Sequence, residues 1–152
     1  PPQMMQNPSD KSPVAAHRAS PFIMAKDAAG VMAFIEAVFD AKPLSEPLFH
    51  ANGDLWNAEL QIGSSTILLG EASDGMALPG FVYVYVDDPD ATHAKAIAQG
   101  AEPVMPIADQ FYGHRDGGVK DPFGNLWWIG KKTEDVPFDE LKRRAAEVDD
   151  HR

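Results

Sequence analysis

Aromatic residues alternate along one strongly apolar run, FVYVYV, in a way that could form a ligand-binding surface. Successive side chains of a strand point to opposite faces, so Phe81, Tyr83 and Tyr85 are predicted to share one face. A tyrosine places a hydroxyl at the end of a rigid apolar ring, which suits stacking plus one hydrogen bond. Trp128 and Trp56 could add further aromatic planes. The alternative is that these rings belong to ordinary core packing.

Three polar residues could bring imidazole and carboxylate chemistry to one site: His50, Glu59 and His114. Such a set can orient a ligand, and it is also the kind of set that holds a divalent metal ion. A structural interpretation is equally open. In that case His50 closes a hairpin, Glu59 pairs at the surface, and His114 lies in an exposed loop.

Arg115 lies in the segment YGHRDGG, and its guanidinium could receive a carboxylate or a phosphate in a bidentate contact. Equally, Arg115 could pair with Asp116 or Asp121 and only fix the loop. The absence of cysteine excludes thiolate catalysis and disulfide bonds. No Gly-x-Ser-x-Gly, His-Glu-x-x-His or nucleotide-binding loop is present, so we assign no catalytic residue.

These side chains need a scaffold, and the sequence predicts a strand–helix–three-strand unit that occurs twice. In the first half Asp27 caps a helix that runs to about Phe39, with apolar residues at helical spacing. In the second half Asp88 caps a helix with Pro89 at its first position, and Gly100 ends it. The predicted strands are 21–25, 44–50, 56–62 and 66–69, then 81–86, 102–105, 111–119 and 126–129.

The composition restricts the partners and the compartment. The chain has 152 residues, 23 of them acidic and 13 basic, and its charge of −10 argues against nucleic acid as a partner. No apolar run reaches the roughly 18 residues of a membrane helix, so we expect no membrane partner. Residues 1–18 lack the apolar core of a secretory signal and are predicted to be a flexible tail of a cytoplasmic protein. Residues 133–152 are predicted to form a charged helix or tail that packs on its own subunit or on a partner.

The most specific motif is DPFGNLWWI at residues 121–129, a proline turn followed by an aromatic strand. Together with the segments Ala58-Glu59-Leu60 and Val86-Asp87-Asp88, it resembles the vicinal oxygen chelate superfamily. That superfamily includes glyoxalase I, extradiol dioxygenases and bleomycin-resistance proteins, and the similarity is greatest to its PhnB-like branch. Two positions depart from the usual pattern: Asp40 stands where glycine is usual, and His114 where aspartate is usual.

The resemblance implies an α+β fold of two tandem βαβββ modules that form half-barrels around a cavity. The modules would span residues 19–72 and 80–132 of a domain that covers 19–132. It also implies a homodimer, and a cavity lined by the face of the FVYVYV strand that carries the aromatic rings. A small-molecule ligand is therefore the expected partner.

The resemblance also bears on metal binding. Metal-binding members place His, Gln or Glu on the first and fourth strands of each module. The corresponding positions here fall near Ser20 and Leu68 and at Phe81 and Trp128. Aliphatic and aromatic groups do not replace imidazole and carboxylate ligands. We therefore expect neither a bound metal nor another cofactor.

Two functions follow from these observations. The first is a metal-free binder of a small, partly aromatic molecule, cationic or neutral, as in antibiotic sequestration. The alternative is a divalent-metal-dependent lyase, isomerase or dioxygenase with a non-standard site made by His50, Glu59 and His114. The predicted ligand-binding residues are Phe81, Tyr83, Tyr85, Trp128, Trp56, Glu59, His114 and Arg115.

Overall fold

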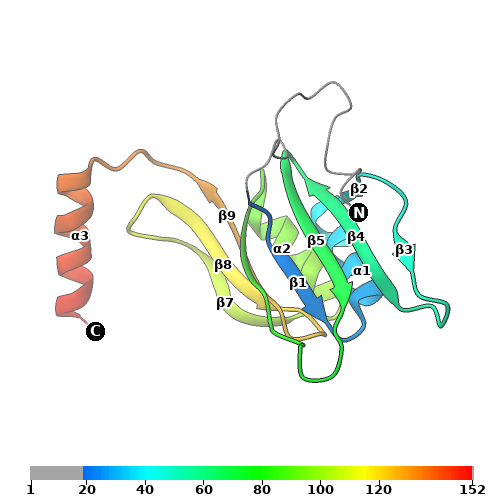
Figure 1. Ribbon diagram of the computed structural model, residues 1–152. Helices are drawn as coiled ribbons and strands as arrows, with labels where there is room; N and C mark the ends of the chain where they lie inside the picture. Colours follow the sequence, from blue (N-terminus) through cyan, green and yellow to red (C-terminus); the bar gives the residue numbers. More distant parts are fainter. Residues whose placement is uncertain (1–18, 152) are drawn as a thin grey trace. The chain divides into compact units, whose positions relative to one another are not determined.

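The computed structural model describes residues 19–151, and these residues form two compact units (Figure 1). The first unit contains the chain up to Gly80 together with Phe123–Asn125. The second contains Phe81–Pro122 and the chain from Leu126 onward. The tail predicted at residues 1–18 lies outside the described residues.

The first unit is a sheet with one helix. Its strands follow the order β1-β5-β4-β2, and β3 pairs with β4. β1 runs parallel to β5, whereas β4 is antiparallel to β5. The elements are β1 (Phe22–Ala25), α1 (Ala28–Phe39), β2 (Lys42–Pro43), β3 (Leu48–Phe49), β4 (Leu55–Ile62) and β5 (Ser65–Glu71).

Helix α1 has the bounds that the sequence predicted, because its capping residues work as expected. The Asp27 carboxylate accepts a hydrogen bond from the backbone N–H of Gly30 at 3.1 Å. One side of the helix is buried against the sheet, at Val31, Phe34, Ile35, Val38 and Phe39 (Figure 1). The helix ends at Asp40 in the left-handed conformation, with φ 56°. This backbone conformation explains why glycine is usual at that position.

The second unit repeats the plan, with strand order β6-β9-β8-β7. β6 is parallel to β9, and the other pairs are antiparallel. Its elements are β6 (Phe81–Tyr85), α2 (Pro89–Ala98), β7 (Glu102–Asp109), β8 (His114–Lys120), β9 (Leu126–Lys132) and α3 (Phe138–Asp150). The predicted α+β fold of two strand–helix–strand modules is thus confirmed.

Three predicted strands differ from the structure for a clear physical reason. The strand predicted at 44–50 pairs only at Leu48–Phe49, because Pro47 lacks the N–H that would continue the ladder. Strand β7 extends to Asp109 rather than ending near residue 105. It tolerates its two prolines because it is the edge strand, and its register shifts beside them. β8 starts only at His114, because Gly113 takes φ 88° in the preceding turn.

Helix α3 is amphipathic, as predicted, but none of its side chains is buried. Arg144 connects it to the rest of the unit by donating to the carbonyl oxygen of Phe111 at 3.0 Å and by pairing with Glu134. Its apolar residues Phe138 and Val148 remain exposed. Among the described residues, no helix combines the length and the apolar character that crossing a membrane requires.

Candidate functional site

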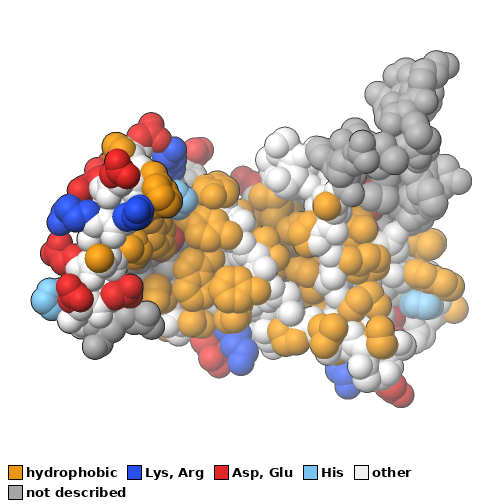
Figure 2. Space-filling view, turned by 60° about the vertical axis from the view of Figure 1, so that its left-hand side comes forward, with side chains coloured by type: hydrophobic (Ala, Val, Ile, Leu, Met, Phe, Trp, Pro, Cys, Tyr) orange, Lys and Arg blue, Asp and Glu red, His pale blue; other side chains and the backbone are white. Residues whose placement is uncertain are grey.

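The sheet of the second unit has two chemically different faces. Helix α2 packs on one face, where Trp127 and Ile129 of β9 are fully buried. The register of the strands places alternate residues on the opposite face, which we call the open face. Its members include Phe81, Tyr83, Tyr85, His114, Asp116 and Trp128. Many hydrophobic side chains lie at the surface that Figure 2 shows.

The aromatic rings of the open face contact one another but are largely uncovered. Phe81 stacks on Trp128 with 5.2 Å between ring centroids, and Tyr83 lies 4.9 Å from Tyr85. Phe81 and Tyr85 remain 64% and 68% exposed. Gly118 leaves room for the indole, since a Cβ at this position would lie 2.3 Å from the Trp128 ring. The four predicted rings of the second unit therefore share one surface.

A buried carboxylate forms the polar end of the open face. The Tyr83 hydroxyl donates to Oδ2 of Asp116 at 2.8 Å, and the Tyr112 hydroxyl donates to the same oxygen at 2.5 Å. The Tyr83 hydroxyl also lies 3.0 Å from Nδ1 of His114. Gly130 makes this possible, because a Cβ there would lie 2.0 Å from the Tyr83 hydroxyl oxygen.

The electrostatics of this cluster keep both tyrosines protonated. Burial raises the pKa of Tyr83 far above its usual value, and the hydrogen bond to Asp116 raises it further. The pKa of Tyr112 is raised by the same two causes in the same order. Asp116 is 0% exposed, and its Oδ1 has no hydrogen-bond partner among the described residues. Each hydroxyl therefore remains a hydrogen-bond donor throughout the physiological pH range.

Arg115 lies on the helix side of the sheet, not on the open face. Its guanidinium pairs with Asp90 of α2 at 2.9 Å and with Asp109 at 3.2 Å. The pKa of Asp90 is lowered mainly by its hydrogen bond to Arg115. The partners predicted from the sequence, Asp116 and Asp121, were wrong, although the structural role was right. A guanidinium held by two carboxylates is not placed to receive a ligand on the open face.

Two further predicted residues, Trp56 and His50, lie together in the first unit. Their rings stack with 4.2 Å between centroids. His50 also closes the hairpin through its backbone, as the structural interpretation expected, by donating to the carbonyl of Asp54 at 2.8 Å. The two rings line an open hollow of about 530 Å³. The other residues that line this hollow are Phe22, Met24, Leu48, Asn57 and Glu71.

Glu59 of β4 is buried, not paired at the surface. Its side chain is 1% exposed, and neither carboxylate oxygen has a hydrogen-bond partner among the described residues. Burial raises the pKa of this carboxyl above its usual value. The interpretation of Glu59 as part of a surface ion pair was therefore wrong.

The side chains considered as metal ligands are not grouped. Within residues 19–151, no set of three or more His, Asp or Glu side chains is placed to hold a metal ion. Nδ1 of His114 faces the Tyr83 hydroxyl, while Phe81 and Trp128, two positions where the resemblance implied metal ligands, stack on each other. The described donor residues thus do not fit the divalent-metal site that the alternative function requires.

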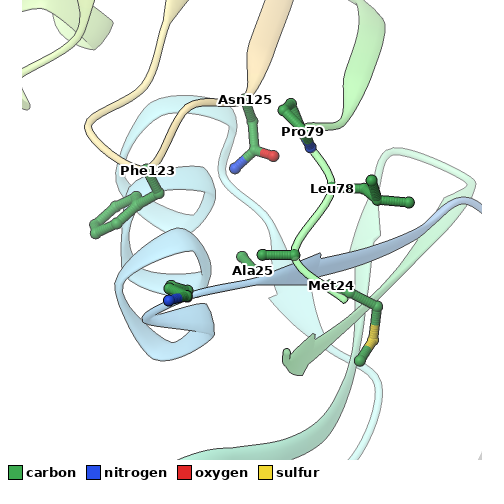
Figure 3. A pocket seen from close by; sticks show the side chains of 8 residues that line it. Met24, Ala25, Leu78, Pro79, Phe123 and Asn125 are labelled. Atoms are coloured by element: carbon green, nitrogen blue, oxygen red, sulfur yellow. The ribbon is translucent and has the colours of Figure 1, made fainter. Parts of the chain in front are cut away.

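A second hollow, of about 210 Å³, lies in the first unit where the chain enters the proline turn (Figure 3). Asn125 lies beside Pro79 (Figure 3), and its Oδ1 accepts a hydrogen bond from the backbone N–H of Gly80 at 2.8 Å. Phe123 lies against Gly30, where a Cβ would be 2.4 Å from the ring. The lining is largely apolar with one amine, that of Lys26, so we assign this hollow to the packing of the turn.

Sequence reasoning missed Asp116 and Tyr112 as members of the site. One signal was present: Asp116 follows His114 by two residues in a predicted strand, so the two side chains share a face. The same rule places the intervening Arg115 on the opposite face. The predicted strand 111–119 placed Tyr112 on this face by the same rule, but in the structure Tyr112 lies in the turn before β8 and its hydroxyl reaches Asp116 from there.

Comparisons with known proteins agree with this architecture. Residues 15–129 match the family model of the Glyoxalase/Bleomycin resistance protein/Dioxygenase superfamily. An uncharacterized protein of Mycobacterium bovis is 30% identical over 143 residues, covering 86% of this chain and 93% of that protein. The crystal structure of TioX from Micromonospora sp. ML1 is similar with a TM-score of 0.62 and 21% identity, covering 80% of this chain and 100% of that one. The structure of a PhnB protein from Bacillus cereus is similar with a TM-score of 0.58 and 15% identity, and the match covers 74% of this chain and 98% of that one.

Proposed function

The chain belongs to the Glyoxalase/Bleomycin resistance protein/Dioxygenase superfamily, and on this premise we propose that it binds a small, partly aromatic molecule. The observation that carries the proposal is the uncovered aromatic surface of the open face. Phe81 and Tyr85 leave about two thirds of their surface to solvent beside the stacked Trp128. Contiguous exposed apolar surface of this kind is typical of binding sites.

The open face offers stacking planes and polar groups at the same time. A planar ligand would stack on Phe81, Tyr85 and Trp128, and each aromatic pair contributes about 0.5–1.5 kcal/mol beyond the buried area. The aromatic faces and the net charge of −10 also suit a cationic ligand. The superfamily includes bleomycin resistance proteins, and sequestration of an antibiotic requires only such complementarity and no chemical step.

We infer that binding needs no metal cofactor, because the described His, Asp and Glu residues form no set of metal ligands. Elemental analysis by mass spectrometry tests this on protein purified without an affinity metal or a chelator. Metal-free protein that still binds ligand is the expected result. A stoichiometric divalent metal would contradict the inference and favour the alternative of a metal-dependent lyase, isomerase or dioxygenase.

We also propose that the protein is a cytoplasmic homodimer. The exposed apolar residues Phe138 and Val148 of α3, which no described residue buries, support a self-association surface. Light scattering coupled to size-exclusion chromatography should give twice the monomer mass. A monomer at micromolar concentration would contradict this part of the proposal.

The binding proposal is tested by ligand-observed saturation-transfer NMR with two aromatic probes, 2-naphthol and naphthalen-2-ylmethylammonium. Trp128→Ala should weaken binding about fivefold to tenfold, because one stacking plane is lost. Phe138→Ala is the control, since it removes an exposed ring that belongs to α3 and not to the strands of the open face. Equal affinity of the wild type and Trp128→Ala would refute the open face as the site.

A further inference from the structure

Three polar groups of the open face form a chain in which the hydrogens can be assigned. The Tyr83 hydroxyl lies between Oδ2 of Asp116, at 2.8 Å, and Nδ1 of His114, at 3.0 Å. A tyrosine hydroxyl has one proton to donate, so only one of these two neighbours can receive it. The other neighbour must donate to the hydroxyl oxygen.

The Asp116 carboxylate determines which neighbour accepts the hydrogen bond from the Tyr83 hydroxyl. Oδ2 of Asp116 is a carboxylate oxygen, and such an oxygen accepts hydrogen bonds. Asp116 is fully buried, and Tyr83 and Tyr112 supply the donors to its Oδ2. Turning the Tyr83 proton toward His114 would leave lone pairs of the Tyr83 hydroxyl and of Oδ2 facing each other at 2.8 Å, and only Tyr112 would still donate to this buried oxygen. The proton of Tyr83 therefore goes to Asp116, and Nδ1 of His114 carries a hydrogen.

We propose that Asp116, acting through Tyr83, holds neutral His114 as the Nδ1–H tautomer and so presents Nε2 as a hydrogen-bond acceptor on the open face. Nε2 has no hydrogen bond to a described residue and is not among the buried unpartnered atoms, so it is free to bind. The rings of Tyr85 and Tyr112 lie 6.0 and 5.4 Å from the imidazole and limit its reorientation.

The Nε2 acceptor of His114 determines the class of ligand that the open face selects. This inference about the ligand rests on the proposed function of the same face. An acceptor beside aromatic planes selects aromatic molecules that carry an O–H or N–H donor, and it disfavours analogues that carry only acceptors. Asp116 and Tyr83 are positioning residues in this account, while His114 contacts the ligand.

The tautomer is tested directly by ¹⁵N NMR of the histidine side chains at mildly alkaline pH, where imidazoles are in general neutral. The spectrum of His114→Gln assigns the His114 signals. Wild-type His114 should show the Nδ1–H pattern, and Tyr83→Phe should shift it toward Nε2–H. Tyr85→Phe is the matched control, because Tyr85 is a neighbouring tyrosine for which only ring contacts are seen, and it should leave the tautomer unchanged. An Nε2–H pattern in the wild-type protein would overturn the proposal, whatever the variants do.

The ligand class is tested with 2-naphthol, which carries a donor, and 2-methoxynaphthalene, which does not. Wild-type protein should bind 2-naphthol about fivefold to tenfold more tightly, and Tyr83→Phe should abolish most of this preference. Equal binding of both probes to the wild type would overturn the donor preference and leave the proposed function intact. If neither probe binds, the ligand class and the proposed function both fail, while the tautomer is decided by the NMR spectrum alone.

Discussion

The Tyr83 hydroxyl occupies the space that a side chain at Gly130 would fill. A Cβ at Gly130 would lie 2.0 Å from the hydroxyl oxygen, 2.7 Å from the ring carbon that bears it, and 2.8 Å from Cβ of Asp116. These distances are far below van der Waals contact, so Gly130→Ala must push Tyr83 away from Asp116. The substitution therefore tests the geometry of the polar cluster independently of any ligand.

The expected cost has two parts. Overpacking a well-filled site costs about 1–3 kcal/mol. The displacement of Tyr83 also breaks a hydrogen bond to a charged group, worth about 1.5–3 kcal/mol. We expect Gly130→Ala to lower the free energy of unfolding by about 3–5 kcal/mol, which corresponds to a melting temperature about 6–20 °C lower for a chain of this size.

A double-mutant cycle separates this explanation from general crowding. Tyr83→Phe removes the oxygen that the new Cβ would strike, so Gly130→Ala should cost about 1–2 kcal/mol less in that background. Gly118→Ala is the control, because its Cβ would strike the Trp128 ring and not Tyr83. Urea unfolding followed by circular dichroism measures all variants. If Gly130→Ala and Tyr83→Phe are additive, the assigned position of the Tyr83 hydroxyl is refuted.

Three other predictions follow from single residues. Asp40→Gly should stabilise the protein by about 1 kcal/mol, because Asp40 holds φ 56° and places a negative charge at the C-terminus of α1; unchanged urea unfolding would contradict this. Burial raises the pKa of Glu59 in the folded state, so the stabilisation from its protonated form is complete below the unfolded pKa and is lost as pH rises through the folded pKa. Glu59→Gln should therefore melt at a higher temperature than the wild type at neutral pH, and the two melting temperatures should become more similar as the pH is lowered. A difference in melting temperature that does not depend on pH would contradict this. Arg115→Ala should lower the melting temperature only slightly and leave 2-naphthol binding unchanged, because its ion pairs are solvent-exposed and lie on the helix side; a large loss of binding would show that Arg115 reaches the ligand.

Much of the scaffold could be predicted because its signals are local. Asp27 and Asp88 cap the helices as their side-chain chemistry requires, and each accepts from a backbone N–H three residues later. Alternation along β9 separates Trp127, which is in the core, from Trp128, which is on the open face. The strand predicted at 44–50 was too long, because Pro47 lacks the N–H that would extend the ladder beyond Leu48–Phe49.

The polar cluster could not be predicted, because it depends on pairing between distant segments. Tyr83 meets Asp116 only because β6 lies beside β9 and β9 beside β8, a long-range arrangement that composition does not encode. The partner of Arg115 was missed for the same reason, since Asp90 is 25 residues away on α2. Gly130 directly follows the strand predicted at 126–129, and its role as space for the Tyr83 hydroxyl depends on the pairing of β9 with β6 and β8.

The most direct test of ligand binding on the open face uses the three tryptophan side chains as reporters in one ¹H–¹⁵N spectrum. Trp128 lies on the open face, Trp127 is buried with its indole N–H donated to Asp121 at 2.8 Å, and Trp56 lies in the first unit. Titration with 2-naphthol should move the Trp128 indole signal progressively and leave that of Trp127 in place. A Trp128 signal that stays fixed while the Trp56 signal moves would contradict the assignment of the binding site to the open face.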